Sequence, residues 1–326
     1  MRINPVPKAG ELLDIAFKRA SKEMLPNIRK SKRKELKPFV AGKISIAANI
    51  LDDRLQAVIK QFPDLEKSND FLNEMISTVV DLNELRRALG HLQSKKKLLK
   101  MVLRKSIGAI HKSSNEREIS KAEKAFFGRT SSLIRELESD LLLLEKVRRE
   151  ITAFPEIDAE APTVIITGFP NVGKTTILKR LTGSAPAIAP YPFTTKGLQL
   201  GFFEERYLRY QVIDTPGLLD RKMSERNPIE KRAISTLKHI AGIIVFVVDP
   251  TETSGFSLQE QKRLLQDIER EFEKKVIVVL NKSDLASAEQ LEEARKEFCA
   301  EAISCGEGKE CDLRKQIVSE SKELFK

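Results

Sequence analysis

GFPNVGKT, from Gly168 to Thr175, is the stretch that decides the fold of the C-terminal half of this 326-residue chain. It follows a short apolar run at 163–167 and precedes a stretch with helical periodicity, which is typical of a loop joining a strand to a helix. Gly168 and Gly173 permit a tight turn whose backbone N–H groups can approach phosphate oxygens. Lys174 offers a cation to the β- and γ-phosphates, and Thr175 offers a hydroxyl to Mg²⁺. The spacing therefore predicts a phosphate-binding loop.

The sequence around this loop alternates between strands and helices. Continuous apolar runs predict parallel strands with both faces covered, at 164–167, 243–249 and 276–280, and a further short run lies at 300–303. Amphipathic stretches predict the covering helices, at 173–181, 228–240, 257–272 and 286–298. Two further runs at 198–203 and 207–213 predict a hairpin, which would place one antiparallel strand at the sheet edge. An α/β domain with a mostly parallel, six-stranded sheet is therefore expected at 163–326.

A second motif, DTPG from Asp214 to Gly217, closes the second strand of the hairpin. Asp214 can hold Mg²⁺ through its water shell, and the amide of Gly217 can sense a γ-phosphate. Alone, this pattern is usually a plain turn. Its position about forty residues after the phosphate loop favours the functional interpretation.

The motif NKSD, from Asn281 to Asp284, follows a buried strand and indicates which base is bound. Asp284 can accept hydrogen bonds from the N1–H and the 2-amino group of guanine together, and adenine lacks that donor pair. Asn281 and Lys282 are expected to flank the ring and to brace the phosphate loop. The tripeptide from Ser304 to Gly306 either offers an amide to the guanine oxygen or forms an ordinary turn. Together the motifs predict a P-loop GTPase domain that binds GTP and GDP.

The first half of the chain, 1–155, has no strand-like runs, and its apolar residues recur at helical spacing. Capping residues predict two long helices, at 68–111 and 113–154. Three prolines are expected to mark helix boundaries: Pro26, Pro38 and Pro63. We expect an all-α helical bundle, with a linker at 156–162 before the GTPase domain at 163–326.

Positive charge is concentrated in the helical half. The chain has a net charge of +10, yet residues 1–155 carry 32 basic and 20 acidic side chains, whereas residues 156–326 carry 25 and 27. Dense basic runs lie at 29–37 and 95–105. Each run alone is usually a solvated helix face, but their confinement to one half favours an RNA phosphate surface. The low aromatic content of 6% favours recognition of a folded RNA over reading of single strands.

Several classes of protein are excluded by composition. Three cysteines provide no disulfide framework of the kind found in secreted domains, and three histidines make a zinc site improbable. The first residues lack the apolar core of a signal peptide, and no apolar run is long enough for a membrane span. A cytoplasmic protein in a reducing compartment is expected.

Two stretches carry a resemblance to a known family. GFPNVGKTT and YPFTT, the latter from Tyr191 to Thr195, resemble the first motif and the switch I motif of the Obg branch of translation-factor-related GTPases. VPKAGELLDIAFKRASK, from Val6 to Lys22, together with the helical half, is similar to the nucleolar GTP-binding protein 1 family. The resemblance covers essentially the whole chain. Longer eukaryotic members continue past the GTPase domain, so a chain ending at Lys326 resembles the compact archaeal form.

The resemblance implies a function and a partner. It implies that GTP hydrolysis times a step in large ribosomal subunit assembly, with the helical domain bound to ribosomal RNA or a precursor particle. It also implies an activating protein partner, a monomeric state off the ribosome, and a nucleolar location if the source is eukaryotic. A membrane partner is not expected, because no Trp anchors flank the basic runs. The alternative is a signalling or scaffold GTPase whose helical domain binds a protein.

The resemblance also assigns individual residues. Thr195, or the adjacent Thr194, would close on Mg²⁺ and the γ-phosphate, while Lys174 and Gly217 complete the groups acting on the phosphates. Leu218 stands where Ras-like enzymes have the glutamine that orients the attacking water, so intrinsic hydrolysis is expected to be slow. Asn171 either binds K⁺, as in some relatives, or only stiffens the loop.

Mg²⁺ is expected on Thr175, Thr195 and Asp214. Nucleotide contacts are expected from Gly168, Phe169, Pro170, Asn171, Val172, Gly173, Lys174, Thr175, Thr176, Phe193, Thr194, Thr195, Asp214, Gly217, Asn281, Lys282, Asp284, Ser304, Cys305 and Gly306.

Overall fold

The computed structural model describes residues 3–24, 36–154, 156–183, 187–189, 191, 197–205, 207–220, 226–240, 242–298, 303–305 and 313–324. The chain divides into two units. One comprises Met1–Ser68 and Ile76–Thr152, and the other comprises Asn69–Met75 and Ala153–Lys326. The division between Thr152 and Ala153 falls near the boundary at residue 155 expected from the sequence. The assignment of Asn69–Met75 to the second unit was not expected.

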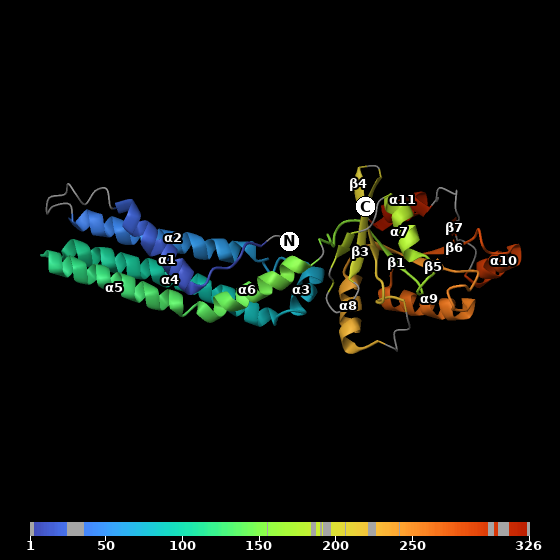
Figure 1. Cartoon of the computed structure of the whole chain (residues 1–326), viewed down its shortest axis with the longest axis horizontal. Coiled ribbons are helices and arrows are strands. Elements are labelled where there is room, and N and C mark those ends of the chain that lie inside the picture. The colour runs from blue at the N-terminus through green and yellow to red at the C-terminus, as the bar shows by residue number, and fades with distance from the viewer. Residues whose placement is uncertain are drawn as a thin grey trace. The chain divides into compact units, whose positions relative to one another are not determined.

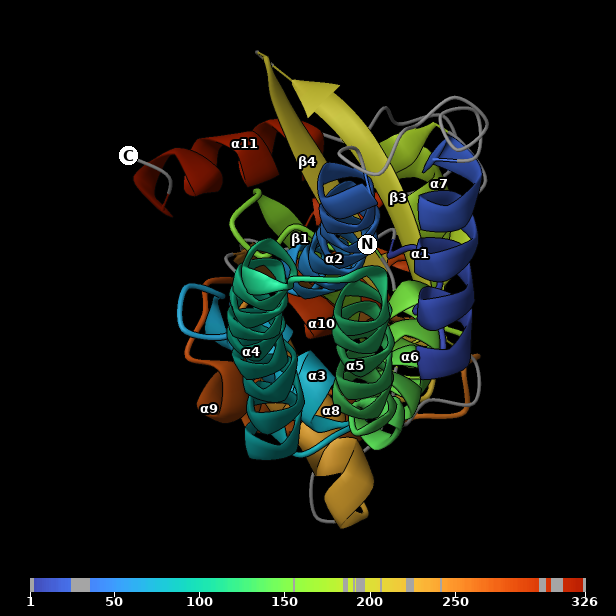
Figure 2. The ribbon, with the colours of Figure 1, turned by 90° about the vertical axis from the view of Figure 1, so that its left-hand side faces the viewer.

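The first unit is a helical bundle, as expected from its periodicity. Its helices are α1 (Ala9–Met24), α2 (Leu36–Gln61), α4 (Leu82–Lys112), α5 (Glu116–Arg135) and α6 (Glu138–Ala153). Figure 2 shows α1, α2, α4 and α5 facing the viewer; α2 packs against α1 and α4, and α4 packs against α5. Buried leucine, isoleucine and alanine side chains from these helices form the centre of the bundle.

The long helix predicted at 68–111 is wrong, because the structure has two helices there. The first is α3 (Asp70–Ser77), and α4 starts after a new N-cap at Asp81, whose side chain accepts a hydrogen bond from the backbone N–H of Asn83 at 2.7 Å. Asp81 thereby satisfies a backbone donor that a continuous helix would have used internally. The apolar pattern continues across the break and so does not reveal it.

The helix predicted at 113–154 is also divided. Asn115 caps α5 as expected, accepting a hydrogen bond from the backbone N–H of Glu118. The helix then ends at Arg135, and the N–H of Leu137 donates to the carbonyl of Ile134 in a tighter turn. Leu137 is fully buried, so the leucine spacing continues through a break that only the backbone geometry shows.

The second unit is built on a seven-stranded sheet in the order β2-β3-β4-β1-β5-β6-β7. The strands are β1 (Thr163–Thr167), β2 (Ala187–Ala189), β3 (Leu198–Glu205), β4 (Leu208–Asp214), β5 (Gly242–Val248), β6 (Val276–Asn281) and β7 (Ile303–Cys305). Strand β3 is antiparallel to both neighbours, and the pairings of β1, β4, β5, β6 and β7 are parallel. The expected P-loop GTPase fold is confirmed, with the six predicted strands present and the short β2 added outside β3.

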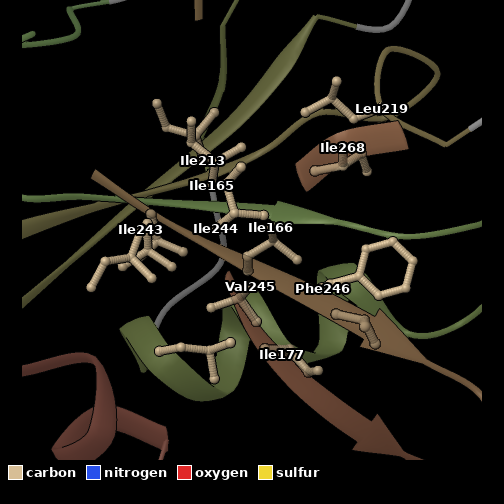
Figure 3. Packing of buried hydrophobic residues seen from close by; sticks show 14 of the residues in the cluster. Ile165, Ile166, Ile177, Ile213, Leu219, Ile243, Ile244, Val245, Phe246 and Ile268 are labelled. Atoms are coloured by element: carbon tan, nitrogen blue, oxygen red, sulfur yellow. The ribbon is translucent and has the colours of Figure 1, made fainter. Parts of the chain in front are cut away.

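Helices cover both faces of this sheet. They are α7 (Lys174–Thr182), α8 (Pro228–Lys238), α9 (Leu258–Phe272), α10 (Ala288–Glu297) and α11 (Leu313–Leu324), the last of which the sequence analysis had not identified. Helices α7 and α11 lie on one face, and α8 and α9 lie on the other (Figures 1 and 2). Figure 3 shows Ile177 of α7 and Ile268 of α9 on opposite sides of the strands. All seven residues of β5 are buried between these layers, which explains their unbroken apolar run.

Three of these helices begin with a capping box. In this motif the side chain of the capping residue accepts a hydrogen bond from the backbone N–H three residues on, and the side chain of that later residue accepts one from the backbone N–H of the capping residue. The capping residues are Asn227 before α8, Ser257 before α9 and Ser287 before α10. Each box fixes the point where a loop from the sheet turns into a helix. The loops that leave the carboxyl ends of β4, β5 and β6 therefore each end at a defined residue.

Helix α3 supplies core residues to the second unit. Phe71 and Met75 are buried in the same hydrophobic cluster as the strands of the sheet. On the neighbouring surface, Glu74 accepts a hydrogen bond from Ser235 of α8 and forms an ion pair with His239. A segment that lies among the bundle helices in the sequence is thus part of the α/β unit. Within the described ranges, no helix is long and apolar enough to span a membrane.

Candidate functional site

The carboxyl ends of neighbouring strands bring the sequence motifs to one edge of the sheet. Strand β1 leads into Gly168, and Ile166 pairs with Asp214 at the end of β4. On the other side, Asn281 at the end of β6 pairs with Cys305 of β7. Because these strands are parallel, their terminal loops meet at the same edge, where ligands bind in open α/β sheets.

Glycine is required at two positions of the phosphate loop. Gly168 and Gly173 have φ values of 139° and 98°. A Cβ on Gly168 would lie 2.5 Å from the carbonyl oxygen of Val247, and one on Gly173 would lie 2.1 Å from Nδ2 of Asn281. The loop therefore packs closely on β5 and on the base motif. Helix α7 starts at Lys174, so its N-terminal N–H groups face the loop.

Lys174 is folded against this loop. Its ammonium donates hydrogen bonds to the carbonyl oxygens of Gly168 and Phe169, each at 2.8 Å. Both bonds bridge the loop from its last residue to its first two, and the side chain is buried. Phe169 in turn stacks on Phe256, with ring centroids 4.0 Å apart. The ammonium of Lys174 is therefore held in place by the phosphate loop, whose bound phosphates it is expected to contact.

The other loop residues have distinct environments. Asn171 is exposed and adopts φ 63°, Pro170 is partly exposed and Val172 is buried. Thr176 lies in the first turn of α7, where its N–H bonds the carbonyl of Gly173.

Thr175 and Asp214 lie together, 39 residues apart in the sequence. The hydroxyl of Thr175 donates to Oδ2 of Asp214 at 3.0 Å. Asp214 is only 1% exposed, and its Oδ1 is buried without a hydrogen-bond partner among the described residues. Burial raises the pKa of Asp214, and the charge of Lys174 and the bond from Thr175 oppose that rise. A buried carboxylate oxygen left unpaired beside a hydroxyl fits a hard divalent cation such as Mg²⁺.

The DTPG turn is closed by a hydrogen bond to the nearby side chain of Asp220. The N–H of Gly217 donates to Oδ2 of Asp220 at 2.9 Å, and Gly217 has φ 80°. Leu218 is 1% exposed, because its side chain belongs to the hydrophobic core of the unit. The position that carries a glutamine in Ras-like enzymes is thus occupied by a packed, apolar side chain.

The base motif contacts the phosphate loop through one residue and a different loop through the next. Nδ2 of Asn281 donates to the carbonyl of Val172 at 2.8 Å, so Asn281 braces the phosphate loop as expected. Lys282 does not contact that loop through its ammonium. It donates instead to Oδ2 of Asp249 at 2.7 Å. Asp284 is exposed, as a group that accepts bonds from a ligand must be.

Asp249 and the loop that follows β5 were not predicted from the sequence. Asp249 is fully buried and bonds Thr251, Thr253 and Lys282. One signal was available, because an acidic residue directly follows an apolar strand and precedes the hydroxyl-rich stretch PTETS. A carboxylate buried at the end of an apolar strand needs hydrogen-bond donors, and the hydroxyl groups of this stretch can supply them.

Four expected site residues lie outside the described residues, namely Phe193, Thr194, Thr195 and Gly306. Ser304 and Cys305 are described through their backbone alone, as the end of β7. Tyr191, at the start of the YPFTT stretch, is buried, and its hydroxyl donates to the carbonyl of Ala233 in α8 at 3.1 Å.

A glycine-rich loop between β1 and α7, a buried aspartate at the end of β4 and an NKSD motif at the end of β6 define a P-loop GTPase domain, joined here to a helical bundle. Comparison with protein families agrees in both halves. The NOG1 N-terminal helical domain matches residues 1–158, and the 50S ribosome-binding GTPase family matches residues 163–282. The chain belongs to the nucleolar GTP-binding protein 1 family.

Individual relatives define the extent of the similarity. Nucleolar GTP-binding protein 1 of Drosophila melanogaster is 33% identical over 297 residues, 90% of this chain and 46% of the relative. An uncharacterized protein of Methanocaldococcus jannaschii is 35% identical over 249 residues, 76% of this chain and 70% of the relative. A crystal structure described as a nucleolar GTP-binding protein 1 from Plasmodium falciparum is 30% identical, with a TM-score of 0.42, over 53% of this chain and 90% of that chain. The chain spans about half the length of the named curated relatives.

Proposed function

We propose that the α/β unit binds GTP and GDP, hydrolyses GTP, and acts as a switch in large ribosomal subunit assembly. The observation that carries the proposal is the meeting of three motifs at one sheet edge, where Asn281 bonds the phosphate loop and Thr175 bonds Asp214. The DTPG and NKSD motifs are weak alone, but their contacts with the phosphate loop join residues more than 35 positions apart. A chance turn would not need these partners.

The phosphate loop would bind the nucleotide through its backbone. On binding, the ammonium of Lys174 would exchange its two carbonyl partners for the β- and γ-phosphates, which are stronger, anionic acceptors. The N-terminal N–H groups of α7 add to this attraction. Lys174→Ala is expected to abolish tight nucleotide binding while the helical unit keeps its circular dichroism. Normal nucleotide titration of that variant would contradict the proposal.

Thr175 and Asp214 would hold Mg²⁺, with Thr195 or Thr194 as the further ligand supplied by switch I. When bound, the ion neutralises the negative charge that develops on the phosphates. Asp214 would act from behind Thr175, through the water shell of the ion, because its carboxylate is buried and bonds the hydroxyl of Thr175. Gly217 would turn its N–H from Asp220 toward the γ-phosphate, which links switch II to the presence of GTP.

We propose that intrinsic hydrolysis is slow, because Leu218 cannot orient a water molecule. Its side chain is packed in the core, so Leu218→Gln should destabilise the unit by roughly 1–3 kcal/mol and should not raise kcat. A substantial increase in kcat would show that the missing glutamine alone limits the rate. An activating protein would then be unnecessary.

A bound K⁺ is the alternative source of charge beside the phosphates, with Asn171 as its ligand. Turnover in KCl and in NaCl at equal ionic strength separates the two interpretations of Asn171. Equal rates would remove K⁺ from the proposal, and Asn171 would then only stiffen the loop.

Guanine selection is assigned to Asp284. Asp284→Asn exchanges an acceptor for a donor at the base edge, so affinity should move from GTP toward xanthosine triphosphate. Competition binding with both nucleotides measures this shift. Unchanged affinity for GTP would disprove the assignment.

For the helical unit we propose a ribosomal RNA or precursor particle as the partner, supported by the concentration of positive charge in residues 1–155. Part of the basic run on α4 is already neutralised within the unit. Lys95 pairs with Glu136, and Lys96 and Lys100 pair with Asp52. The exposed cations of this run that have no such pair among the described residues are Lys97, Arg104 and Lys105. The run at 29–37 lies mostly outside the described residues.

A protein partner is the second candidate, because exposed apolar side chains lie among these cations. Leu98 and Met101 on α4 are 39% and 50% exposed. Replacement of Lys97 and Arg104 by glutamine should weaken binding to ribosomal particles and reduce its salt dependence if RNA is the partner. Replacement of Leu98 and Met101 by serine should have the larger effect if a protein is the partner. A cytoplasmic location, or a nucleolar one in a eukaryote, belongs to the same proposal.

A further inference from the structure

Asp249 is a buried carboxylate that the phosphate and base motifs do not include. It directly follows β5 and is 0% exposed. Its Oδ1 accepts hydrogen bonds from the N–H and the hydroxyl of Thr251, at 3.0 and 2.6 Å. Its Oδ2 accepts from the hydroxyl of Thr253, the N–H of Ser254 and the ammonium of Lys282, at 3.1, 2.9 and 2.7 Å. Every contact lies at the sheet edge that carries the site.

This carboxylate is kept charged. Burial alone would raise the pKa of Asp249, but the hydrogen bonds from Lys282, Thr251 and Ser254 outweigh it and lower the pKa below its ordinary value. A neutral amide could accept the loop bonds on its oxygen. It could not offer a second acceptor to an ammonium, so the bond to Lys282 is the one that specifically needs an aspartate.

The loop that starts at Asp249 is held by helix α9. Gln261 of α9 is fully buried and accepts a hydrogen bond from the N–H of Asp249 at 2.9 Å. The same amide donates to the carbonyl oxygens of Asp249 and Phe256, both at 3.0 Å. Phe256 then stacks on Phe169 of the phosphate loop. Asp249 is therefore anchored to rigid elements before it contacts Lys282.

Lys282 is held at both ends. Its backbone has φ 56°, a left-handed conformation that side-chain-bearing residues rarely adopt. Its ammonium bonds Asp249 and the hydroxyl of Thr253, the latter at 3.0 Å. Asn281, the preceding residue, is tied to the phosphate loop. The four methylene groups of Lys282 thus lie between a backbone held through Asn281 and an ammonium held by Asp249 and Thr253. This restricts a side chain that is ordinarily flexible.

We infer that Asp249 is a positioning residue for the guanine ring, which acts by holding Lys282 so that its methylene stem forms one wall of the base site. The inference rests on the proposed binding of guanine nucleotides. Among the described residues, the carboxylate of Asp249 bonds Thr251, Thr253, Ser254 and Lys282 and no residue of the phosphate loop, so its contribution is the same for GTP and for GDP. It slows dissociation of the base and leaves recognition of the phosphates unchanged.

The test uses the full chain and a double-mutant cycle of Asp249→Asn, Lys282→Met and their combination. Equilibrium and stopped-flow titrations with fluorescent GDP and a non-hydrolysable GTP analogue give Kd and dissociation rates, and competition by inorganic pyrophosphate reports the phosphate loop alone. We expect Asp249→Asn to raise Kd about tenfold for both nucleotides, mainly through faster dissociation, with competition by pyrophosphate unchanged. The combined variant should be no weaker than either single variant, because both remove one interaction.

A matched control separates positioning from support of the loop. Thr251→Val removes the hydroxyl that bonds Oδ1 of Asp249 and the hydroxyl of Thr253, but it keeps the bond between Asp249 and Lys282. It should therefore lower the melting temperature and affect Kd much less than Asp249→Asn does. Thr253→Val removes an exposed hydroxyl that bonds the ammonium of Lys282, and it should weaken both nucleotides even if Asp249→Asn does not fold.

Three results would overturn the inference. They are full additivity of Asp249→Asn and Lys282→Met, an equal loss of pyrophosphate competition, and unchanged Kd in Thr253→Val when Asp249→Asn cannot be measured. If the wild-type chain binds no guanine nucleotide, the proposed function fails and the inference fails with it. If the wild type binds and the Asp284→Asn shift is seen while Asp249→Asn behaves as wild type, only the inference fails.

Discussion

The N–H of Gly217 and the carboxylate of Asp220 are joined by a hydrogen bond of 2.9 Å within the DTPG turn. In the proposed function, the same N–H senses the γ-phosphate. A carboxylate and a phosphate are both anionic acceptors, and they cannot share one donor without repulsion. In this conformation Asp220 therefore takes the N–H that the proposed function assigns to the γ-phosphate, so GTP would have to displace Asp220 whereas GDP would not.

Removal of this competitor should favour GTP. We expect Asp220→Ala to raise the ratio of GTP to GDP affinity about three- to tenfold, since one partly exposed hydrogen bond to a charged group is lost. Titration with GDP and a non-hydrolysable GTP analogue measures the ratio. Glu293→Gln on α10 removes one exposed negative charge without this contact and should leave the ratio unchanged. An unchanged ratio in Asp220→Ala would mean that the bond opens at no cost.

The close approach of Asn281 to Gly173 predicts the outcome of a small substitution. A Cβ at Gly173 would meet Nδ2 of Asn281 at 2.1 Å and would also require a strained φ of 98°. Gly173→Ala should therefore weaken both nucleotides by at least about tenfold, because the strain alone is worth about 1–2 kcal/mol. Gly183→Ala has the strained φ of 67° without any atom within 4 Å, so it should lose stability but keep binding. Similar binding losses in both variants would contradict the steric argument.

The acid stability of the helical unit should depend on Glu145. Its hydrogen bond from Arg148 lowers the pKa of Glu145 to about 2 against the opposing effect of burial, with further bonds from Val6 and Arg149. Because the folded pKa is below the unfolded value of 4.5, the stabilisation is complete above about pH 4.5 and is lost as the pH falls toward 2.

Urea unfolding at pH 7 and at pH 3, followed by circular dichroism, tests this expectation. Glu145→Gln should cost roughly 1–3 kcal/mol at pH 7, and the difference from wild type should shrink at pH 3. Glu150→Gln, at an exposed position five residues on, should show no such trend. A difference that stays constant between the two pH values would assign the effect of Glu145 to packing.

Helix α3 should stabilise the α/β unit although it lies among bundle helices in the sequence. Met75 is 2% exposed within the hydrophobic cluster of the sheet, so Met75→Ala should destabilise that unit by about 2–5 kcal/mol. Met101→Ala on α4 is the matched control, because Met101 is half exposed and its loss should cost little. Amide hydrogen exchange reports the two units separately.

In Met75→Ala, exchange should become faster in β1 and β5. If only the bundle helices lost protection, α3 would belong energetically to the first unit. A fragment that starts at residue 153 lacks Phe71 and Met75, so it should be less stable than the same unit in the full chain.

The helical half illustrates how periodicity succeeds and fails. The spacing of apolar residues predicted a bundle, because each helix must bury one face. It did not find the break at Leu137, since that residue is buried like its neighbours in the stripe. It also did not show that Lys96 is buried against Asp52 of another helix, which removes a cation from the expected surface.

The phosphate loop, the aspartate of DTPG and the NKSD motif were predicted by residue type and spacing alone. Their chemistry is local, since a tight turn needs glycine and a phosphate needs a lysine and backbone donors. The strand and helix pattern around them then defined the fold class. What residues 69–75 pack against was not predictable, because an amphipathic helix shows that it buries a face and not which core receives it.

The sequence by itself therefore determined the class of this protein and the residues expected to hold phosphates, metal and base. Only the tertiary structure decided how they are supported. Lys282 and Asp249 are 33 positions apart, and no short-range pattern relates them. They meet because β5 and β6 are parallel neighbours whose carboxyl ends open at the same edge, where the ammonium of Lys282 reaches the buried, charged carboxylate of Asp249.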